Sequence, residues 1–530
     1  MADTEVDALV IGSGHNGLVA AAAMADAGWD VLVLEAAEHP GGAVRSAELV
    51  PGFTSDLFSA FYPMALASPA ITALELESHG LQWSHSPAVY GHARSAQDTD
   101  APVVHHDVEA TAALLSHYDP RDGDTWMTLF EQWKRIRGPL LDALFGPFPP
   151  VSAGARLVRT LGLSETMRFA RFAALPARTM AHELFHSDAA RCLLLGNAMH
   201  GDVPTDAPVS GMMGYLLTML AQDVGYPAPV GGSSALTTAL IHRGAASGAG
   251  LECSQAVETI DVRGGRACAV HTAAGDTFRA RRAIVADVSA PALYGSLLPY
   301  DAVPRRLHED LRTFEWDTPV VKVNYALDRR ICWNSPSLTD AGTVHLGADD
   351  NGLVHWAADL TTGVLPQSPF MLFGQMTTAD RTRSPAGTES AWAYTHLPRG
   401  VVDDDAADIV ADRVDSVLEA HAPGFLDSVL GRVVQRPSDL HGADPNLHSG
   451  AVNGGTAQLQ QQLIFRPTPG LGRSETPVDG LFLGSASAHP GGGVHGAAGL
   501  NAARAALGQR GARGWLKKKA TSSLMELLTR

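Results

Sequence analysis

Apolar residues open the chain in short runs separated by glycines. Val6–Ile11 has the length and composition of a buried strand, and Leu18–Ala27 has the composition of a helix that stops at Gly28. A second apolar run, Val31–Leu34, follows directly. This order predicts a strand, a helix and a second strand, which together form a βαβ unit.

The turn after the first predicted strand carries the sequence G-x-G-x-x-G, with glycines at 12, 14 and 17. In a βαβ unit, Gly12 permits a tight turn, Gly14 lets a pyrophosphate approach the backbone, and Gly17 lets the helix pack on the strand. The free amides and positive dipole end of the helix favour phosphates. Glu35, 18 residues after the last glycine, suits a ribose hydroxyl. The unit is therefore predicted to bind a dinucleotide.

The rest of the chain alternates between strand-like and helical patterns. A three-stranded meander is predicted at Gln255–Asp261, Ala267–His271 and Thr277–Val285. Residues 76–224 are predicted to be mostly helical, with apolar stretches at Leu129–Phe145, Ala189–Met199 and Val209–Leu220. Residues 300–440 are predicted to hold strands at Val320–Leu327, Leu353–Asp359, Phe370–Met376 and Ala391–Leu397, then a helix at Ala406–His421.

These patterns predict an α/β fold in which inserts interrupt one nucleotide-binding domain. Residues 1–75, 225–300 and 440–512 are assigned to a discontinuous Rossmann-like FAD- or NAD(P)-binding domain. Residues 76–224 and 300–440 are assigned to a second, α+β, substrate-binding domain. A ligand is expected at the interface between the two domains.

Composition narrows the class of protein. Of the 530 residues, 45% are apolar and 18% are charged, which is typical of a globular protein with a large core. The net charge of −17 argues against nucleic acid as a partner, because phosphate binding needs a surplus of Lys and Arg. The acidic N-terminus does not resemble a secretory signal, and no apolar run is long enough to span a membrane. We expect a cytoplasmic location.

Cysteine and histidine patterns bear on metal and thiol chemistry. The four cysteines form no C-x-x-C pair, so neither a dithiol redox centre nor a Cys-rich zinc site is predicted. His182-Glu183-Leu-Phe-His186 matches H-E-x-x-H, which on a helix can bind zinc. The third ligand of the longer form is missing, and the surrounding apolar residues suit a packed helix. We predict no metal ion.

Two further glycine-rich segments bear on the cofactor. Gly41-Gly42-Ala-Val-Arg45 follows the ribose acid. Near the C-terminus, a strand leads through Gly484 to His489-Pro-Gly-Gly-Gly-Val494, before a helix predicted from about Val494 to Leu507. This loop formally repeats G-x-G-x-x-G, but no apolar strand abuts it and no acid lies about 20 residues on. One dinucleotide site is therefore predicted.

Four segments give the chain a resemblance to the phytoene-desaturase-like flavoproteins, in the group that also holds the amine oxidases. They are Gly14-His-Asn-Gly-Leu-Val-Ala-Ala, Gly41-Gly-Ala with Pro51-Gly-Phe, Tyr226 to Gly232, and His489-Pro-Gly-Gly-Gly-Val. Within that family the chain resembles the subfamily called pyridine nucleotide-disulfide oxidoreductase domain-containing protein 2. The resemblance covers most of the chain and implies FAD as cofactor.

The resemblance also implies a function and a set of site residues. It implies an FAD-dependent oxidoreductase that moves a hydride between an apolar, isoprenoid- or carotenoid-like substrate and flavin N5. The implied cofactor-binding residues are Gly12, Gly14, His15, Asn16, Gly17, Glu35, Gly41, Gly42, Arg45, Val257, Gly484, Gly493 and Val494. His489 and His495 are candidate acid/base groups, and the alternative is that they bond the loop backbone. The implied electron acceptor is O2 or a quinone.

Other functions stay open at this point. One is an FAD enzyme of amine-oxidase type, and another is an FAD-binding protein with a regulatory role. Residues 513–530 are predicted to form a basic amphipathic helix, with Lys517, Lys518 and Lys519 beside a leucine-rich stripe. Such a helix fits either an anionic membrane surface, as a peripheral contact, or the core of the protein itself.

Overall fold

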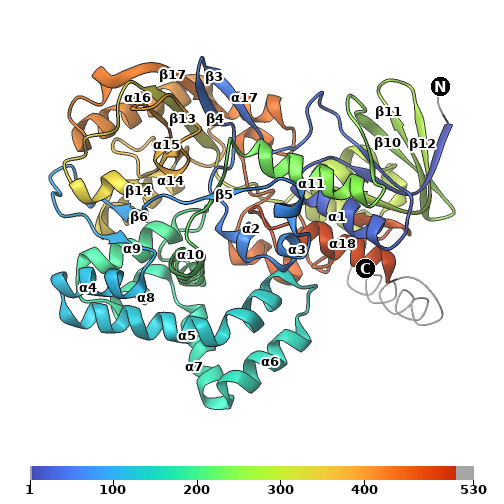
Figure 1. Cartoon of the computed structure of the whole chain (residues 1–530). Coiled ribbons are helices and arrows are strands. Elements are labelled where there is room, and N and C mark those ends of the chain that lie inside the picture. Colours follow the sequence, from blue (N-terminus) through green and yellow to red (C-terminus); the bar gives the residue numbers. More distant parts are fainter. Residues whose placement is uncertain (1–2, 509–530) are drawn as a thin grey trace.

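The computed structural model describes residues 3–508 of the chain. It contains two seven-stranded sheets that stand side by side, with helices packed against both (Figure 1). The predicted basic helix at 513–530 lies outside the described residues, as does the end of the predicted 440–512 segment.

The first sheet joins strands from both ends of the described chain. Its strands run in the order β10, β11, β12, β1, β2 and β9, and β18 also pairs with β12. Their bounds are β1 (Asp3–Ile11), β2 (Val31–Leu34), β9 (Gly250–Glu252), β10 (Val257–Arg263), β11 (Arg266–Thr272), β12 (Thr277–Ala286) and β18 (Leu481–Leu483). β1 pairs in parallel with β2 and β12, while β10, β11 and β12 form an antiparallel meander. The predicted βαβ unit and meander are thus confirmed.

Two helices pack on this sheet beside its glycine-rich turns, and a third packs on one of them. α1 (His15–Asp26) contacts both α11 (Ser234–Ala246) and α18 (Ala497–Leu507) (Figure 1). The contact with α18 is very close, because a Cβ added to Gly499 would lie 1.9 Å from the carbonyl oxygen of Asn16. The beginnings of two helices far apart in sequence therefore meet at one edge of the sheet.

The second sheet is mostly antiparallel and runs in the order β17, β13, β16, β15, β14, β6 and β7. Its strands are β6 (Ala88–His92), β7 (Val103–Val104), β13 (Val320–Leu327), β14 (Ala341–Leu346), β15 (Met371–Gln375), β16 (Glu389–His396) and β17 (Val429–Gln435). β14 and β6 are its parallel pair. α16 (Asp404–His421) buries Val410, Val414 and Leu418 against one face of the sheet. A parallel Rossmann-like sheet with a separate, mostly antiparallel sheet agrees with the predicted α/β fold that carries α+β inserts.

The first insert holds the helices α4 (Val108–Tyr118), α5 (Pro120–Phe145), α6 (Val151–Leu161), α7 (Leu163–Ala174), α8 (Ala177–Leu184), α9 (Asp188–Ala198) and α10 (Ser210–Val224). Of these, α9 and α10 contact β6, on the face of the second sheet opposite α16. The remaining helices and strands are β3 (Ser46–Val50), β4 (Phe53–Asp56), α2 (Pro63–Ala67), α3 (Pro69–Thr72), β5 (Trp83–Ser84), β8 (Ala228–Pro229), α12 (Ala290–Ala292), α13 (Arg305–Leu311), α14 (Asp350–Thr362), α15 (Met376–Ala379) and α17 (Pro437–Ala443).

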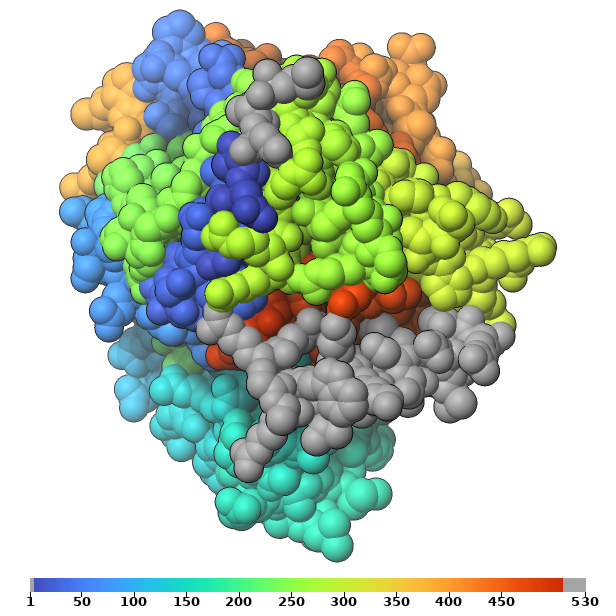
Figure 2. Space-filling view, turned by 90° about the vertical axis from the view of Figure 1, so that its right-hand side faces the viewer, coloured from blue at the N-terminus to red at the C-terminus, as the bar shows by residue number. Residues whose placement is uncertain are grey.

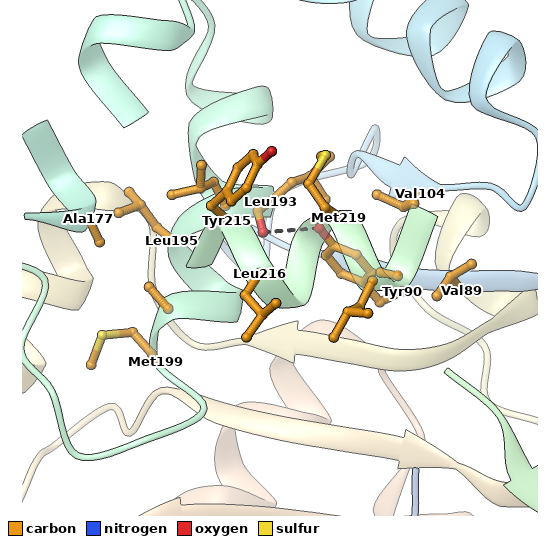
Figure 3. Close-up of a cluster of buried hydrophobic side chains, with 14 of the residues drawn as sticks. Val89, Tyr90, Val104, Ala177, Leu193, Leu195, Met199, Tyr215, Leu216 and Met219 are labelled. Atoms are coloured by element: carbon orange, nitrogen blue, oxygen red, sulfur yellow. Dashed lines mark hydrogen bonds between the residues drawn. The ribbon is translucent and has the colours of Figure 1, made fainter. Parts of the chain in front are cut away.

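A buried cluster fixes α9 and α10 above the sheet (Figure 3). Leu193 and Leu195 of α9 pack with Leu216 and Met219 of α10. Tyr90 of β6 lies beneath them, and its hydroxyl donates to the Leu193 carbonyl oxygen at 3.1 Å. Burying each leucine or methionine contributes about 1.5–3 kcal/mol to the free energy of unfolding. This cluster therefore holds α10 in place.

One predicted strand is wrong. Leu353–Asp359 lies within the helix α14, which begins after Asp349 and ends at Gly363. The Asp349 carboxylate accepts from the Gly352 amide at 2.7 Å, which caps the helix. The buried residues Leu353, Trp356 and Ala357 follow the i, i+3, i+4 spacing of one helix face. The strands β6, β7, β14 and β17 were not predicted.

Candidate functional site

A cavity of about 890 Å3 lies between the two sheets, a volume suited to a large organic ligand. Residues of the first sheet's glycine turn line one part of it, and side chains of the second sheet and α10 line another. Ten of the predicted cofactor-binding residues line this cavity, namely Gly12, Gly14, His15, Asn16, Glu35, Gly42, Arg45, Val257, Gly493 and Val494. Gly17, Gly41 and Gly484 lie behind this lining and shape the backbone, as described below.

The first glycine turn leaves no space for side chains. A Cβ added to Gly17 would lie 2.2 Å from the carbonyl oxygen of Gly12, and Gly12 itself has a φ of 94°. A Cβ added to Gly14 would lie 2.6 Å from the Asp287 carboxylate. The amide of Gly17, in the first turn of α1, donates to that carboxylate at 2.8 Å. The turn therefore presents bare backbone to the cavity, as binding of a pyrophosphate requires.

Glu35 is held at the end of β2 by three donors. One carboxylate oxygen accepts from the Ser13 amide at 2.8 Å and from the Ser13 hydroxyl at 2.5 Å. The other accepts from the Ala37 amide at 2.9 Å. This network fixes the carboxylate beside the glycine turn and leaves it on the cavity wall. A ribose hydroxyl placed there would find an oriented acceptor.

The segment after Glu35 folds over the glycine turn. Gly41 and Gly42 take left-handed φ values of 122° and 53°, and a Cβ added to Gly42 would lie 3.2 Å from the Cα of Gly14. Arg45 donates from Nε to the Gly42 carbonyl at 2.9 Å and from Nη2 to the Ala443 carbonyl at 2.8 Å. Arg45 therefore ties this segment to the C-terminal part of the chain and keeps a guanidinium at the cavity wall.

The C-terminal glycine loop approaches the same cavity from the other side. α18 begins at Ala497 rather than near Val494, because Gly496 takes a left-handed φ of 65°. Gly484 follows β18, and a Cβ added there would lie 3.1 Å from Ala502 of α18, so glycine lets the helix pack closely. Val494 and Gly493 remain on the cavity wall in front of this helix. The loop thus presents backbone and a helix start to the ligand.

The two candidate acid/base histidines occupy different positions. His489 lines the cavity and lies 5.6 Å from the Phe148 ring, and burial lowers its pKa to about 4. His495 is fully buried behind the loop, and its Nδ1 accepts from the Ala497 amide at 3.0 Å. Burial lowers the pKa of His495 to about 3. His489 therefore has access to a ligand, His495 has a backbone-bonding role at the start of α18, and a catalytic role for either stays a prediction.

Lys322 was not found from the sequence. It lies on β13, is 3% exposed, lines the cavity, and donates from Nζ to the Asp56 carbonyl. Burial lowers the pKa of Lys322 to about 7, although the nearby Asp56 carboxylate opposes the shift. Its ammonium group also lies 5.8 Å from the centre of the Trp392 ring. The available signal was a single charged residue within an otherwise uncharged, mostly apolar strand.

Asp287 is a second residue that the sequence analysis missed. It directly follows β12, lines the cavity and accepts from the Gly17 amide. Burial raises the pKa of Asp287 to about 8, against the effect of the Gly17 hydrogen bond. An acid directly after a buried strand was the available signal, because parallel strands end at the same edge of a sheet.

The second sheet supplies an apolar and aromatic floor. Lys322, Tyr394 and Leu372 lie in register on β13, β16 and β15, and all three line the cavity. Trp392 stacks beside Tyr394 with ring centres 6.0 Å apart. Leu216 of α10 lines the cavity as well. This part of the site therefore suits a largely apolar ligand with one titratable amine beside it.

The H-E-x-x-H sequence does not form a cluster. α8 ends at Leu184, before His186, so the two histidines do not share a helix face. His182 Nε2 lies 2.6 Å from Asp350, and Glu183 binds Arg171 at 2.6 Å. His186 Nδ1 lies 3.7 Å from Asp122. Each side chain is thus directed to a different partner.

Together, the Rossmann-type glycine turn, the C-terminal glycine loop and the shared cavity are the features of a dinucleotide-binding protein with a ligand cavity between two sheets. Comparison with known proteins agrees, because the flavin containing amine oxidoreductase family matches residues 17–507. The chain belongs to this family of FAD-dependent oxidoreductases. In the residues that the structure describes, no helix is both long and apolar enough to cross a membrane.

The relatives cover almost the whole chain. The pyridine nucleotide-disulfide oxidoreductase domain-containing protein 2 of Rattus norvegicus is 30% identical over 545 residues, covering 94% of this chain and 93% of that protein. The same-named protein of Mus musculus is 30% identical over 543 residues, with the same coverage of both chains. The structure of putrescine oxidase bound to putrescine has a TM-score of 0.57 at 16% identity, covering 96% of this chain and 99% of that one. The resemblance stated from the sequence is confirmed.

Proposed function

We propose that this oxidoreductase acts on an apolar, isoprenoid- or carotenoid-like substrate and transfers a hydride between that substrate and FAD. The observation that carries this proposal is the wall of the cavity beyond the glycine loops. Met212, Met213 and Leu216 contribute to it from α10, and Leu372 and Trp392 contribute from the second sheet. A long apolar molecule would bury its surface there without leaving polar groups unpaired.

The FAD would lie along the glycine turn and reach the C-terminal loop. The cradle fits, because side chains at Gly12, Gly14 and Gly17 would fill the space that a pyrophosphate needs. Glu35 would accept from the ribose, Val257 would lie near the adenine, and Gly493 and Val494 would face the ring system. Bound FAD supplies a two-electron acceptor at N5. The division into a discontinuous FAD domain and a substrate domain belongs to the same proposal.

The residues of this chain position the substrate and move a proton. The floor formed by Leu372, Trp392 and Tyr394 would orient the reacting carbon and exclude water. Lys322 Nζ, with a pKa lowered to about 7, would exchange a proton in the cavity near neutral pH. Neutral His489 would be a second proton carrier at the C-terminal loop. The electron acceptor proposed for this activity is O2 or a quinone.

One observation favours a second candidate. Trp392 and Tyr394 stack with an interplanar angle of 25°, and such aromatic faces also attract a cationic amine. The second candidate is therefore an FAD-dependent amine oxidase.

The two candidates are separated by anaerobic reduction of the purified holoprotein. Bleaching of the flavin absorbance by limonene or longer isoprenoids, with none by putrescine or cyclohexylamine, is the expected result. Bleaching by amines alone would establish the second candidate. A protein that cannot be reconstituted with FAD would contradict both, and flavin that no compound reduces would favour a regulatory FAD-binding role.

A further inference from the structure

The helices α6 and α7 form a hairpin that projects from the body of the molecule (Figure 1). Residues 151–174 make up this hairpin, which is named here the α6–α7 hairpin. In Figure 2 the helical insert appears as a lobe at the lower edge of the molecule. Two side chains of the hairpin, Ala153 and Phe169, are buried. Most of its surface therefore faces solvent.

The exposed part of α6 is apolar. On a helix with 3.6 residues per turn, Ala153, Leu157 and Leu161 form one side, and they are buried or half-buried. Val151 and Val158 lie on the adjoining side, and they are 73% and 41% exposed. The apolar face of α6 is therefore wider than the part that packs on the protein.

α7 repeats this arrangement. Phe169 is buried and Phe172 is half-buried, which fixes one side of the helix on the protein. Leu163 and Met167 lie on the opposite side and are 76% and 66% exposed. Large apolar side chains gathered on one exposed segment mark an interaction surface, whereas scattered ones do not.

The charge of the hairpin differs from that of the chain. The hairpin holds four arginines (156, 159, 168 and 171) and one glutamate (165), although the whole chain has a net charge of −17. By helical spacing, Arg159 borders the exposed strip of α6 and Arg171 borders that of α7. Three of the arginines form exposed ion pairs, namely Arg156 with Asp142, Arg168 with Glu165 and Arg171 with Glu183. The hairpin and its acidic partners together therefore keep a single surplus positive charge. Exposed apolar strips bordered by arginines match the boundary between the acyl chains and the anionic headgroups of a membrane.

The base of the hairpin is joined to the cavity wall. The Val209 amide donates to the Ala174 carbonyl at 3.2 Å, and the Gly211 amide donates to the Leu175 carbonyl at 3.1 Å. Val209 lines the cavity, and Leu144, just before the hairpin, lines it as well. A surface docked through the hairpin would therefore lie close to the wall of the substrate site.

A second exposed apolar segment lies beside the base of the hairpin. Phe148, in the link between α5 and α6, lines a small cavity together with Gly472. A Cβ added to Gly472 would lie 2.6 Å from the Cα of Ile464, so these segments are neighbours. Leu463 and Ile464 are 44% and 45% exposed, and Leu463 also lines the large cavity. The apolar surface thus continues from the hairpin to the rim of the substrate cavity.

We propose that the α6–α7 hairpin docks the protein on an anionic membrane surface, with Leu163 and Met167 inserted at the boundary of headgroups and acyl chains. The occupant is a lipid bilayer, which the exposed apolar strips favour most and to which the one surplus positive charge adds an attraction for anionic headgroups. This inference goes beyond the proposed function and does not depend on it, because the hairpin can dock whatever the cavity binds.

Vesicle flotation of the full-length holoprotein tests the proposal. Wild type is expected to float with vesicles of phosphatidylcholine and phosphatidylglycerol, and to float less at high salt or with phosphatidylcholine alone. The Leu163→Glu/Met167→Glu double variant is expected to lose roughly tenfold or more of its vesicle partitioning. Leu430→Glu is the control, because Leu430 is also a strongly exposed leucine (60%), and it lies on β17 of the second sheet, away from the hairpin. The control is expected to float as wild type does.

Three results would overturn the proposal. The first is wild type that fails to float, and the second is equal flotation of the double variant and wild type. The third is loss of flotation when Lys517, Lys518 and Lys519 are replaced by glutamine while the double variant still floats, which would assign docking to the C-terminal segment. Sedimentation velocity of wild type and the double variant adds a check. If the double variant floats normally but no longer self-associates, the apolar strips form a contact between copies of the chain instead. Flavin absorbance confirms that each variant is folded.

Discussion

At the scale of single residues, Lys322 is the unusual feature of the site. Its ammonium group lies on a buried strand, beside an indole ring and a backbone carbonyl. Burial disfavours the charged form, so the pKa of Lys322 falls from its ordinary value to about 7. The cost of burying this amine makes the stability of the protein depend on pH.

That dependence has a definite sign. Between about pH 7 and the ordinary lysine pKa near 10.4, the unfolded chain binds a proton at this position and the folded chain does not. As the pH rises through this range, the unfolding free energy of wild type should therefore increase by about 1.4 kcal/mol per pH unit relative to that of Lys322→Met. Denaturant titrations of both proteins from pH 7 to 10 measure the difference. A difference that stays constant over this range would show that Lys322 titrates as an exposed lysine does.

Gly17 tests the flavin cradle. A Cβ at this position would meet the Gly12 carbonyl at 2.2 Å, so Gly17→Ala must displace the turn that is proposed to hold FAD. Inserting a methyl group into a packed site costs about 1–3 kcal/mol. If this cost falls on the FAD-bound form, the affinity for FAD drops roughly 5- to 150-fold. Fluorescence titration of each apoprotein with FAD measures the dissociation constant.

Gly138→Ala is the matched control, because Gly138 lies within the helix α5 and a Cβ there meets open space. The control should bind FAD as wild type does and gain a few tenths of a kcal/mol in stability. Equal affinity of both variants for FAD would mean that the dinucleotide lies elsewhere.

At the scale of elements, the packing of α9 and α10 on β6 sets the position of the cavity wall. Leu193→Ala removes a side chain that is 0% exposed, and α10 carries cavity residues on its other side. We expect a loss of about 2–5 kcal/mol in unfolding free energy. Leu430→Ala, at a 60% exposed position, should change it by less than about 0.5 kcal/mol. Urea unfolding compares the two, and equal effects would contradict the assigned core.

Elements that are determined by residues adjacent in the sequence could be predicted from it. The glycine turn and the strands β1, β2 and β13 were predicted correctly, because glycine spacing and apolar runs are patterns of neighbouring residues. α14 was mistaken for a strand, because Leu353, Val354 and Trp356 look apolar in a short window while its cap at Asp349 lies outside that window. Periodicity separates helix from strand poorly over so few residues.

The roles of Lys322 and Asp287 depend on long-range contacts that no local pattern contains. Lys322 meets the Asp56 carbonyl 266 positions away, and Asp287 meets the Gly17 amide 270 positions away. His489 and His495 are close in sequence, yet one lines the cavity and the other bonds the backbone. Sequence therefore indicated the cofactor loops, while the arrangement of the titratable groups came from tertiary structure.

At the scale of the whole molecule, the nucleotide end of the site is completed by the C-terminal part of the chain. β18 pairs with β12, and α18 packs on α1. A chain that ends at residue 475 should therefore lose FAD binding and show a broad thermal transition, because the first sheet loses an edge and the second glycine loop. A chain that ends at residue 508 keeps both and should bind FAD as the full chain does. Flavin retention on gel filtration distinguishes them.

The contact between Gly499 and Asn16 has a further consequence for how the protein is made. The first turn of α1 leaves the ribosome early, but its packing partner is synthesised only after nearly all of the chain has followed. Contacts of such high sequence separation form late and slowly, while the intervening helices can already collapse. The first sheet therefore lacks its β18 strand, and α1 lacks its α18 partner, until residues 481–507 have been synthesised. We expect FAD binding that needs both glycine loops to begin only after that point.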